Sequence, residues 1–206
     1  MQLNPGYATA HQRYSLYLMC LGRTEESLAE IKRALELDPT SVVINTSFGF
    51  RLFYARRYDE AGEQLHKTLE METNYAQAHL WLGWVYKQQG KYKAALAELQ
   101  TARQLENSSE TLGELGHALA IAGRKNEALA ALAELQALSP RRRLSPYDVA
   151  VIYVGLGDLD QAFLWLQRAC AEHSERLNSI NVNPIFDNLH SDPRFIELLR
   201  RIGLAP

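Results

Sequence analysis

The sequence predicts an all-α solenoid made of five helix–turn–helix repeats and sealed by a short C-terminal helix. Apolar residues recur at helical spacing, and the pattern restarts near residues 8, 42, 76, 109 and 143, a period typical of helical repeat proteins. Among 206 residues there are only 12 glycines and 7 prolines, too few for the many turns of an all-β fold. With 47% hydrophobic residues and a net charge of −2, the chain can bury a core and is not of the disordered class.

A glycine after the first helix sets the register of four of the five repeats. These glycines stand in the pairs Leu21-Gly22, Gln89-Gly90, Ala122-Gly123 and Leu156-Gly157. Aligning them divides the chain into the units 8–41, 42–75, 76–108, 109–142 and 143–176. Only the second unit differs, with Arg56 at the glycine position. Because solenoid units are stabilised by their neighbours, we expect one continuous solenoid over residues 8–176 rather than two globules.

Two columns of small residues mark where the helices of each unit meet. The first-helix column holds Ser15, Gly49, Gly83, Gly116 and Ala150. The second-helix column holds Ser27, Ala61, Ala95, Ala128 and Ala162. Since small side chains let two helix axes approach to about 8–10 Å, we expect a close helix crossing in every unit.

The two ends of the chain differ from the repeats. At the N-terminus, residues 1–7 with Leu3-Asn4-Pro5 read either as the tail of a preceding repeat or as the start of the first helix, where proline is tolerated. At the C-terminus, residues 177–206 read as a linker and a capping helix. Asp192 suits the N-cap of that helix, Pro193 its first position and Gly203 the residue past its end.

The repeat units resemble the tetratricopeptide repeat (TPR) family. The third unit carries Ala-His-Leu-Trp-Leu-Gly-Trp-Val-Tyr at 78–86 and Gly-Lys-Tyr-Lys-Ala-Ala-Leu at 90–96, and the first ends Lys-Arg-Ala-Leu-Glu-Leu-Asp-Pro at 32–39. The resemblance covers residues 8–176. It implies a right-handed α-α superhelix whose first helices line a concave binding surface.

The C-terminal segment is similar to a bacterial arrangement. It reads Pro-Ile-Phe-Asp-Asn-Leu at 184–189 and Ser-Asp-Pro-Arg-Phe at 191–195, followed by a helix containing Leu-Leu-Arg-Arg. This resembles the C-terminal repeat regions of CadC-like winged-helix transcription regulators and of some adenylate cyclases and serine/threonine kinases. The resemblance implies the sensory or regulatory part of a larger bacterial signalling protein. No winged-helix, kinase or cyclase motif stands in these residues.

The sequence lacks the motifs of catalysis and cofactor binding. There is no GxSxG, Walker-type loop, GxGxxG or HExxH, so we expect no enzyme activity, no cofactor and no metal. The two cysteines, Cys20 and Cys170, are far apart and predict neither a disulfide framework nor a zinc site. The histidines His11 and His79 share one repeat column but are two units apart, which favours structural roles for both.

Charge and hydropathy narrow the class of partner and the compartment. A net charge of −2 argues against a direct nucleic-acid interface, and the basic run Arg141-Arg142-Arg143 is short enough to be a solvated loop. The longest apolar run, from Val149 to Leu156, is far too short to span a membrane, and no signal peptide begins the chain. We expect a cytoplasmic protein that binds neither nucleic acid nor membrane.

The concave surface carries the best functional signal. Aromatic residues dominate binding hot spots, and aromatic or polar side chains stand at first-helix positions off the buried stripe. The predicted partner-binding groove comprises Phe50, Phe53, Tyr54, Trp81, Trp84, Gln88 and His117. The alternative is that some of these rings pack between units. For Trp81, packing between units is at least as well supported as exposure in the groove. The carboxylate clamp of chaperone-binding relatives is absent, because its columns hold Gln12, Leu16, Ser47, Gln77 and Trp81.

These features together favour a non-catalytic scaffold that binds a protein or peptide partner in the groove. Self-association into a homo-oligomer is an alternative, because a first unit without a neighbour would expose apolar surface near Tyr14, Tyr17 and Leu21. Sensing of a small molecule in the groove is a further alternative. It rests on the family resemblance alone.

Overall fold

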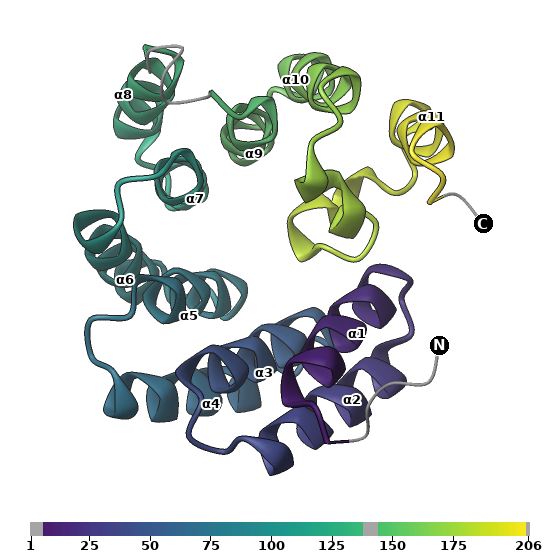
Figure 1. Cartoon of the computed structure of the whole chain (residues 1–206). Helices are drawn as coiled ribbons and strands as arrows, with labels where there is room; N and C mark the ends of the chain where they lie inside the picture. The colour runs from purple at the N-terminus through teal and green to yellow at the C-terminus, as the bar shows by residue number, and fades with distance from the viewer. Residues whose placement is uncertain (1–5, 138–143, 205–206) are drawn as a thin grey trace.

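The computed structural model describes residues 6–137 and 144–204, and over these ranges the chain is helical without a β-strand. Helices pair in antiparallel fashion and the pairs stack side by side into a curved solenoid (Figure 1). The pairs are α1 (Ala8–Cys20) with α2 (Thr24–Leu37), α3 (Val42–Tyr54) with α4 (Tyr58–Met71), α5 (Ala76–Gln88) with α6 (Tyr92–Leu105), α7 (Ser109–Ile121) with α8 (Lys125–Gln136), and α9 (Pro146–Leu156) with α10 (Leu159–Ala171). The predicted all-α superhelix of five repeats is confirmed.

Two features predicted from the sequence lie outside the described residues. One is the Leu3-Asn4-Pro5 segment at the N-terminus, and the other is the basic run Arg141-Arg142-Arg143 between α8 and α9.

The turn inside each helix pair depends on one residue with left-handed backbone. Gly22, Gly90, Gly123 and Gly157 have φ between +69° and +77°, a conformation that glycine adopts without steric penalty. In the second pair this place is taken by Arg56, with φ of +63°. A residue with a Cβ is disfavoured there by about 1–2 kcal/mol, so Arg56 departs from the repeat pattern at a free-energy cost.

Close crossings occur where the small-residue column predicts them. A Cβ added to Gly49 would lie 2.7 Å from Cγ of Leu65, and one added to Gly83 would lie 2.7 Å from Cγ of Leu99. Both leucines belong to the second helix of the same pair, so larger residues at these two glycines would push the helices apart.

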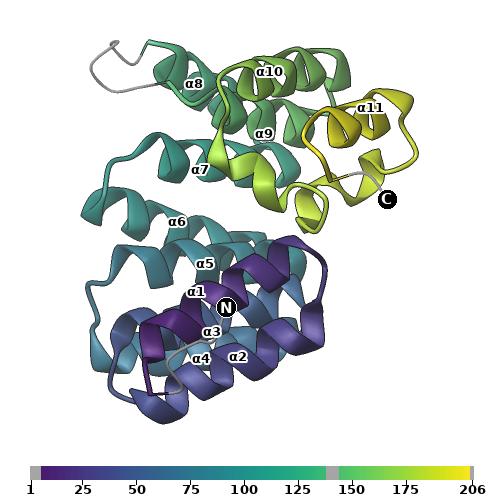
Figure 2. The same ribbon diagram turned by 45° about the vertical axis from the view of Figure 1, so that its right-hand side comes forward.

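The fourth and fifth pairs are joined in a different way from the others. A Cβ on Gly113 of α7 would lie only 3.2 Å from Cα of Asp148 on α9, and one on Gly116 would lie 2.6 Å from Cδ1 of Ile152. On α9, Gly155 approaches the backbone oxygen of His117 in the same way. Because α7 and α9 meet almost backbone to backbone, the last units turn toward the first ones, and the solenoid bends into a nearly complete ring (Figures 1 and 2).

The segment between α10 and the last helix folds back into this ring. We call residues 172–192 the strap; it contains two short 3-10 helices, η1 (Glu175–Ser179) and η2 (Pro184–Leu189). Figure 2 shows the strap crossing between α9 and the end of α1. Its apolar side chains are buried in a cluster with α9, α10 and α11. The members from the strap are Leu177, Ile180, Ile185, Phe186 and Leu189.

The last helix, α11 (Pro193–Arg201), closes the C-terminal end as predicted. The side chain of Asp192 accepts a hydrogen bond from the backbone N–H of Arg194 at 2.9 Å, which is an N-cap. Phe195, Leu198 and Leu199 are buried against the α9–α10 cluster, and Gly203 takes a positive φ of 76° just past the helix end.

Candidate functional site

Four of the residues predicted to line an open groove are buried. Phe53 is 1% exposed, Trp84 3% and His117 5%, and Tyr54 is buried as well. The expectation that folding leaves these side chains free for a partner is therefore wrong. Phe53 and Trp84 are buried because the rings pack on one another between α3 and α5. The strap covers Tyr54, whose hydroxyl lies 3.2 Å from Oγ of Ser179. His117 lies between Lys87 of α5 and Gly155 of α9.

The remaining predicted residues are partly exposed. Phe50 and Trp81 are stacked, with ring centroids 4.1 Å apart and planes at 23°, so Trp81 packs between units, as its alternative interpretation held. Gln88 is half-buried at the end of α5. Of the predicted set, Phe50 and Trp81 line open pockets.

Two adjoining pockets lie on the concave side of α1 and α3, and we call them together the α1 groove. The first, the strap pocket, has a volume of about 540 Å³ and lies between α1 and the strap. The second, the helix pocket, has a volume of about 620 Å³ and lies between α1 and α3. The two pockets share three lining residues, which are Arg13, Leu16 and Phe50.

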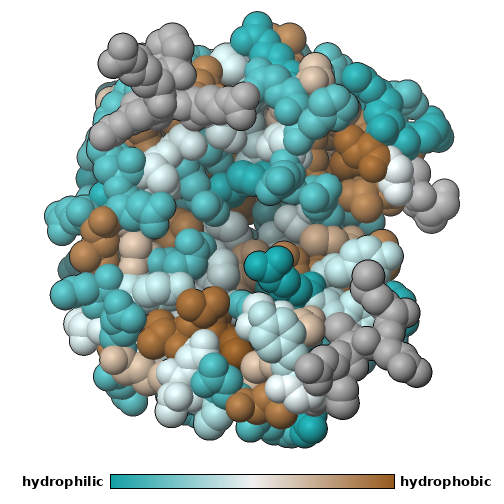
Figure 3. Space-filling model, viewed as in Figure 1, coloured by the Kyte–Doolittle hydropathy of each residue, from teal (hydrophilic) through white to brown (hydrophobic). Residues whose placement is uncertain are grey.

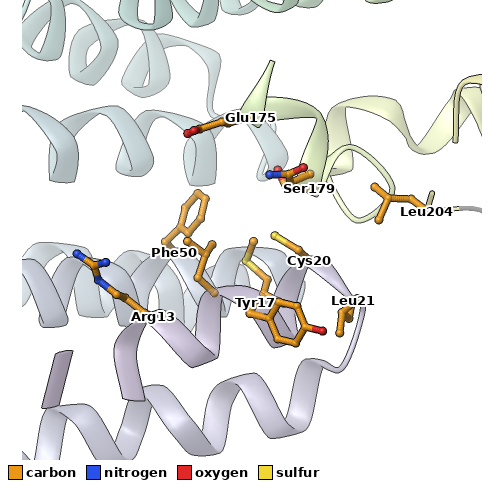
Figure 4. Close-up of a pocket in the computed structure, with 11 residues that line it drawn as sticks. Arg13, Tyr17, Cys20, Leu21, Phe50, Glu175, Ser179 and Leu204 are labelled. Atoms are coloured by element: carbon orange, nitrogen blue, oxygen red, sulfur yellow. The ribbon is translucent and has the colours of Figure 1, made fainter. Parts of the chain in front are cut away.

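The walls of the strap pocket come from distant parts of the chain. Figure 4 shows Arg13, Tyr17 and Cys20 of α1 below the pocket, with Phe50 pointing up between them and the opposite wall. That wall is formed by Glu175 and Ser179 of the strap, and by Leu204 beyond α11. In the space-filling view, side chains fill most of the ring and leave a narrow central hollow (Figure 3).

The charges along the α1 groove are unevenly placed. Arg13 lies where the two pockets meet, is exposed, and has no ion-pair partner among the residues that the structure describes. The carboxylates of Glu175 and Asp38 line the strap pocket and the helix pocket respectively. The middle of the groove is therefore positive and each pocket has one acidic residue.

A second cation, Arg51, lines the helix pocket but is nearly buried. It is 4% exposed, its Nε donates to Oγ of Ser15 at 3.1 Å, and its guanidinium lies 5.3 Å from the Phe50 ring centroid. Burial lowers the pKa of Arg51 to about 10, so the side chain keeps its charge at neutral pH. Desolvation raises the pKa of the neighbouring Cys20 thiol, and the positive charge of Arg51 lowers it by a smaller amount.

The strap is held to the second half of the molecule by a cage of acidic residues around Arg176. The Arg176 Nη1 lies 2.8 Å from Glu110 and 3.2 Å from Asp148, and Nη2 lies 3.5 Å from Glu114. The guanidinium also lies 4.7 Å from the centroid of the Tyr147 ring, within cation–π range. Burial alone would lower the pKa of Arg176, but Asp148 and Glu110, with Tyr147 and Glu114, together raise it.

Behind this cage, α5 and α7 share a buried ion pair. Lys87 Nζ lies 2.5 Å from Oε2 of Glu114 and 3.3 Å from Nδ1 of His117, and the side chains of both Lys87 and Glu114 are 1% exposed. Desolvation lowers the pKa of Lys87, against the pull of Glu114. Desolvation, and secondarily the charge of Lys87, holds the pKa of His117 well below its ordinary value. His117 is therefore a neutral core residue.

The repeated histidines have local partners. His11 Nδ1 lies 2.6 Å from Glu30 Oε2, and His79 Nδ1 lies 2.6 Å from Glu98 Oε2. Each pair links the two helices of its own repeat, which is the structural role expected for both histidines. Across residues 6–137 and 144–204, no three His, Cys, Asp or Glu side chains are grouped so that they could hold a metal ion.

None of the described helices is both long enough and apolar enough to cross a bilayer.

Sequence reasoning identified only part of the α1 groove. Leu16 entered the sequence analysis only as a residue of the clamp columns, and Arg13, one helical turn away on the same face, was overlooked. The spacing of Arg13, Leu16 and Tyr17 along one helix face was the signal that could have found it. Nothing in the repeat pattern indicates that Glu175 and Leu204 would form the opposite wall.

Comparisons with known proteins agree on the nature of the repeats. Residues 8–41 and residues 52–115 each match a family model described as tetratricopeptide repeat. The comparison with curated protein sequences gives no match.

Several solved structures have a similar fold. TTC0263, a thermophilic TPR protein of Thermus thermophilus, has a TM-score of 0.65 at 18% identity, covering 87% of this chain and 98% of that one. PilW, a type IV pilus biogenesis factor, has a TM-score of 0.63 at 20% identity, covering 87% and 84%. YrrB, described as a TPR protein with an unusual peptide-binding site, has a TM-score of 0.51 at 24% identity, covering 86% and 92%.

Solenoids of this kind present extended concave surfaces that are used for binding. The family matches and the similar structures lead to one conclusion: the chain contains tetratricopeptide repeats and folds as a TPR solenoid.

Proposed function

We propose that the chain is an interaction scaffold that binds an extended apolar peptide with one acidic side chain in the α1 groove. The observation that carries this proposal is the joint between the two pockets, where Leu16 and Phe50 provide an apolar floor and Arg13 stands unpaired among the described residues. Leu16 is 43% exposed, so the free protein leaves a large apolar side chain in water at this point.

The dimensions of the groove favour a peptide. Volumes of about 540 and 620 Å³ are within the range of pockets that bind organic ligands, and the pockets follow one another along α1. An extended chain places alternate side chains on the same face. Two apolar side chains of one peptide can therefore fill the two pockets on either side of Phe50.

The charges favour an acidic side chain at the centre of that peptide. A carboxylate beside Arg13 would gain a charge-assisted hydrogen bond. Carboxylates placed farther out would approach Asp38 in the helix pocket or Glu175 in the strap pocket, where like charges repel. The register of the peptide is thus set by a positive centre between two acidic pockets.

We also propose the biological setting that the C-terminal resemblance implies: the cytoplasmic regulatory part of a larger bacterial signalling protein or transcription regulator. It is supported by the Pro-Ile-Phe-Asp-Asn-Leu segment and the capping helix, which form the strap and α11. The reading frame upstream of Met1 tests it, because the proposal requires a winged-helix, kinase or cyclase domain there. An unrelated upstream gene would contradict it.

Two fluorescein-labelled peptide pools test the groove. Both consist of capped nonapeptides with Leu, Phe or Val at positions 3 and 7, and they differ only in having Glu or Lys at position 5, so that all three side chains lie on one face of the extended chain. By fluorescence anisotropy, we expect the Glu pool to bind the native chain more tightly, and Arg13→Glu to reverse that preference. Leu16→Ala should weaken binding of the Glu pool by about tenfold, since an apolar contact at the centre of the site is lost.

The chain offers a matched control for this experiment. Leu129 on α8 is 42% exposed, as against 43% for Leu16, but lines neither pocket of the groove. Leu129→Ala should leave anisotropy titrations unchanged. Equal effects of Leu16→Ala and Leu129→Ala, or no preference between the pools, would refute the proposed site.

Self-association is a second candidate, favoured by exposed rings on α1. Tyr7 and Tyr17 are both more than half exposed, and Leu21 is exposed nearby, which is an apolar surface that a second copy could cover. Sedimentation at micromolar concentration decides the matter. A single species of 23.3 kDa would remove this candidate.

A further inference from the structure

The strap contacts the two halves of the ring very unequally. On the side of α9 and α10, it contributes buried apolar residues to a continuous core, and the Arg176 cage fixes its first turn. Asn183 donates to the hydroxyl of Tyr147 at 3.1 Å, and the Tyr147 ring packs edge-on against Phe186. The strap therefore belongs to the second half of the molecule.

On the side of α1 and α3, the strap makes a smaller contact, which we call the clasp; it consists of the apolar packing of Val182 against the first-half cluster and of polar contacts. Nη2 of Arg56 lies 2.8 Å from Oδ1 of Asp187 and donates to the backbone oxygen of Val182 at 3.3 Å. The second polar contact is the one between Tyr54 and Ser179. Both side chains of the Arg56–Asp187 pair are exposed, so this ion pair contributes little to stability by itself.

The residue that makes the clasp is the one that departs from the repeat pattern. Every other first turn in the solenoid has glycine with positive φ, whereas Arg56 takes the same conformation with a full side chain. Unfavourable backbone conformations of this kind cluster at functional sites, where surrounding contacts hold them in place. Here that side chain reaches across the ring to the strap, over 131 residues of sequence.

The strap pocket depends on the same contact between the two halves. Its lower wall belongs to α1 and α3 and its upper wall to the strap and Leu204 (Figure 4). A ligand that touches both walls has more contacts when the ring is closed than when the strap has moved away. By linkage, such a ligand must stabilise the closed ring, and whatever stabilises closure must strengthen binding.

We propose that the clasp couples ring closure to ligand binding: the peptide in the α1 groove is held between α1 and the strap, and Arg56 favours the closed, binding-competent ring. This inference rests on the proposed function, because it concerns the same groove. It adds the strap residues Glu175 and Ser179 to the binding surface. It also gives Arg56 a role in affinity although it lines neither pocket.

Arg56→Gly separates closure from stability. It removes the Arg56 contacts of the clasp and simultaneously gives the turn the glycine of the other repeats, so we expect the melting temperature to stay unchanged or rise. We expect the same substitution to weaken binding of the Glu-centred peptide pool by about fivefold. It should also accelerate amide hydrogen exchange in residues 178–189 of the unliganded chain by at least a similar factor.

The control is Arg57→Ala, which removes the same charge one residue later. Arg57 is paired with Glu60 at 2.5 Å on α4, and we expect neither affinity nor exchange to change. A charge swap adds a rescue: Arg56→Asp should weaken binding, and adding Asp187→Arg should restore it.

The outcomes distinguish this inference from the proposed function. If the native chain binds the Glu pool and Arg56→Gly binds it equally well, the coupling is wrong while the peptide site stands. If the native chain binds neither pool, the proposed function fails and the coupling fails with it. Faster exchange in Arg56→Gly together with weaker binding and a retained melting temperature is the result that supports the coupling.

Discussion

Replacement of Arg176 by alanine should lower the free energy of unfolding by about 3–5 kcal/mol, as expected when one partner of a buried charge cluster is removed. The substitution leaves Asp148, which is 2% exposed, without the guanidinium that lies 3.2 Å away. Glu110 and Glu114 lose the same cation. The cation–π contact with Tyr147 and the anchor of the strap are lost in the same step. Denaturant titration followed by circular dichroism measures the effect.

Arg168 on α10 provides the control for this experiment. It is exposed and lies over the Trp165 ring, at 4.4 Å from its centroid, so Arg168→Ala removes an arginine–aromatic contact without leaving a buried carboxylate. We expect it to change the free energy of unfolding by roughly 0.5 kcal/mol or less. If Arg176→Ala is as mild as Arg168→Ala, the cage around Arg176 does not hold the strap.

Acidification from pH 7 to pH 5 should destabilise the protein through His117, by about 2 kcal/mol. The pKa of this histidine is held well below 6.5 in the folded chain by burial, whereas the unfolded chain takes up the proton near its ordinary pKa. The stability that depends on neutral His117 is therefore complete above about pH 6.5 and is lost as the pH falls below it.

The groups around His117 reinforce this direction. Lys87 approaches from α5, with Nζ 3.3 Å from Nδ1, and its charge disfavours a second cation. Glu114 on α7 is already paired with Lys87 and lies 3.5 Å from Arg176 of the strap. From α9, Gly155 packs so closely that a Cβ there would lie 3.0 Å from the histidine ring. Within the described part of the chain, the nearby carboxylate is thus already committed to other cations and does not stabilise protonated His117.

In His117→Gln, the free energy of unfolding should fall between pH 7 and pH 5 by about 2 kcal/mol less than in the native chain. This holds even if the variant is less stable at both pH values. Denaturant titrations at the two pH values give the slope, that is, the change in the free energy of unfolding between pH 7 and pH 5. His66→Gln serves as the control, because His66 is exposed on α4 and its replacement should leave the slope unchanged. A native slope that persists in His117→Gln would assign the acid sensitivity to other groups.

Local features of this protein could be predicted well because they depend on residues near one another in sequence. The glycine at the end of each first helix needs only its own φ angle, and Gly22, Gly90, Gly123 and Gly157 all have it. The N-cap at Asp192 depends on a backbone N–H two residues away. The close crossings at Gly49 and Gly83 join helices within one repeat.

The partner site was predicted poorly because exposure in a solenoid depends on what crosses its concave face. Phe53 and Trp84 occupy first-helix positions of the kind expected to face a groove, yet aromatic packing between units buries both. Tyr54 is covered by a strap residue 125 positions away. The surface that stays open was instead found on α1, around Leu16 and Arg13.

The helical repeats, their register and the capping helix follow from the sequence, because periodic apolar residues and turn glycines act over a few residues or between adjacent helices. Arg56 was visible as the one exception to the glycine pattern, but its meaning was not. The near-backbone contact of α7 with α9, the folding of the strap into the ring, and the pairing of Arg56 with Asp187 were decided by the tertiary structure. These contacts join segments far apart in the chain, and helical periodicity carries no information about which distant side chains meet.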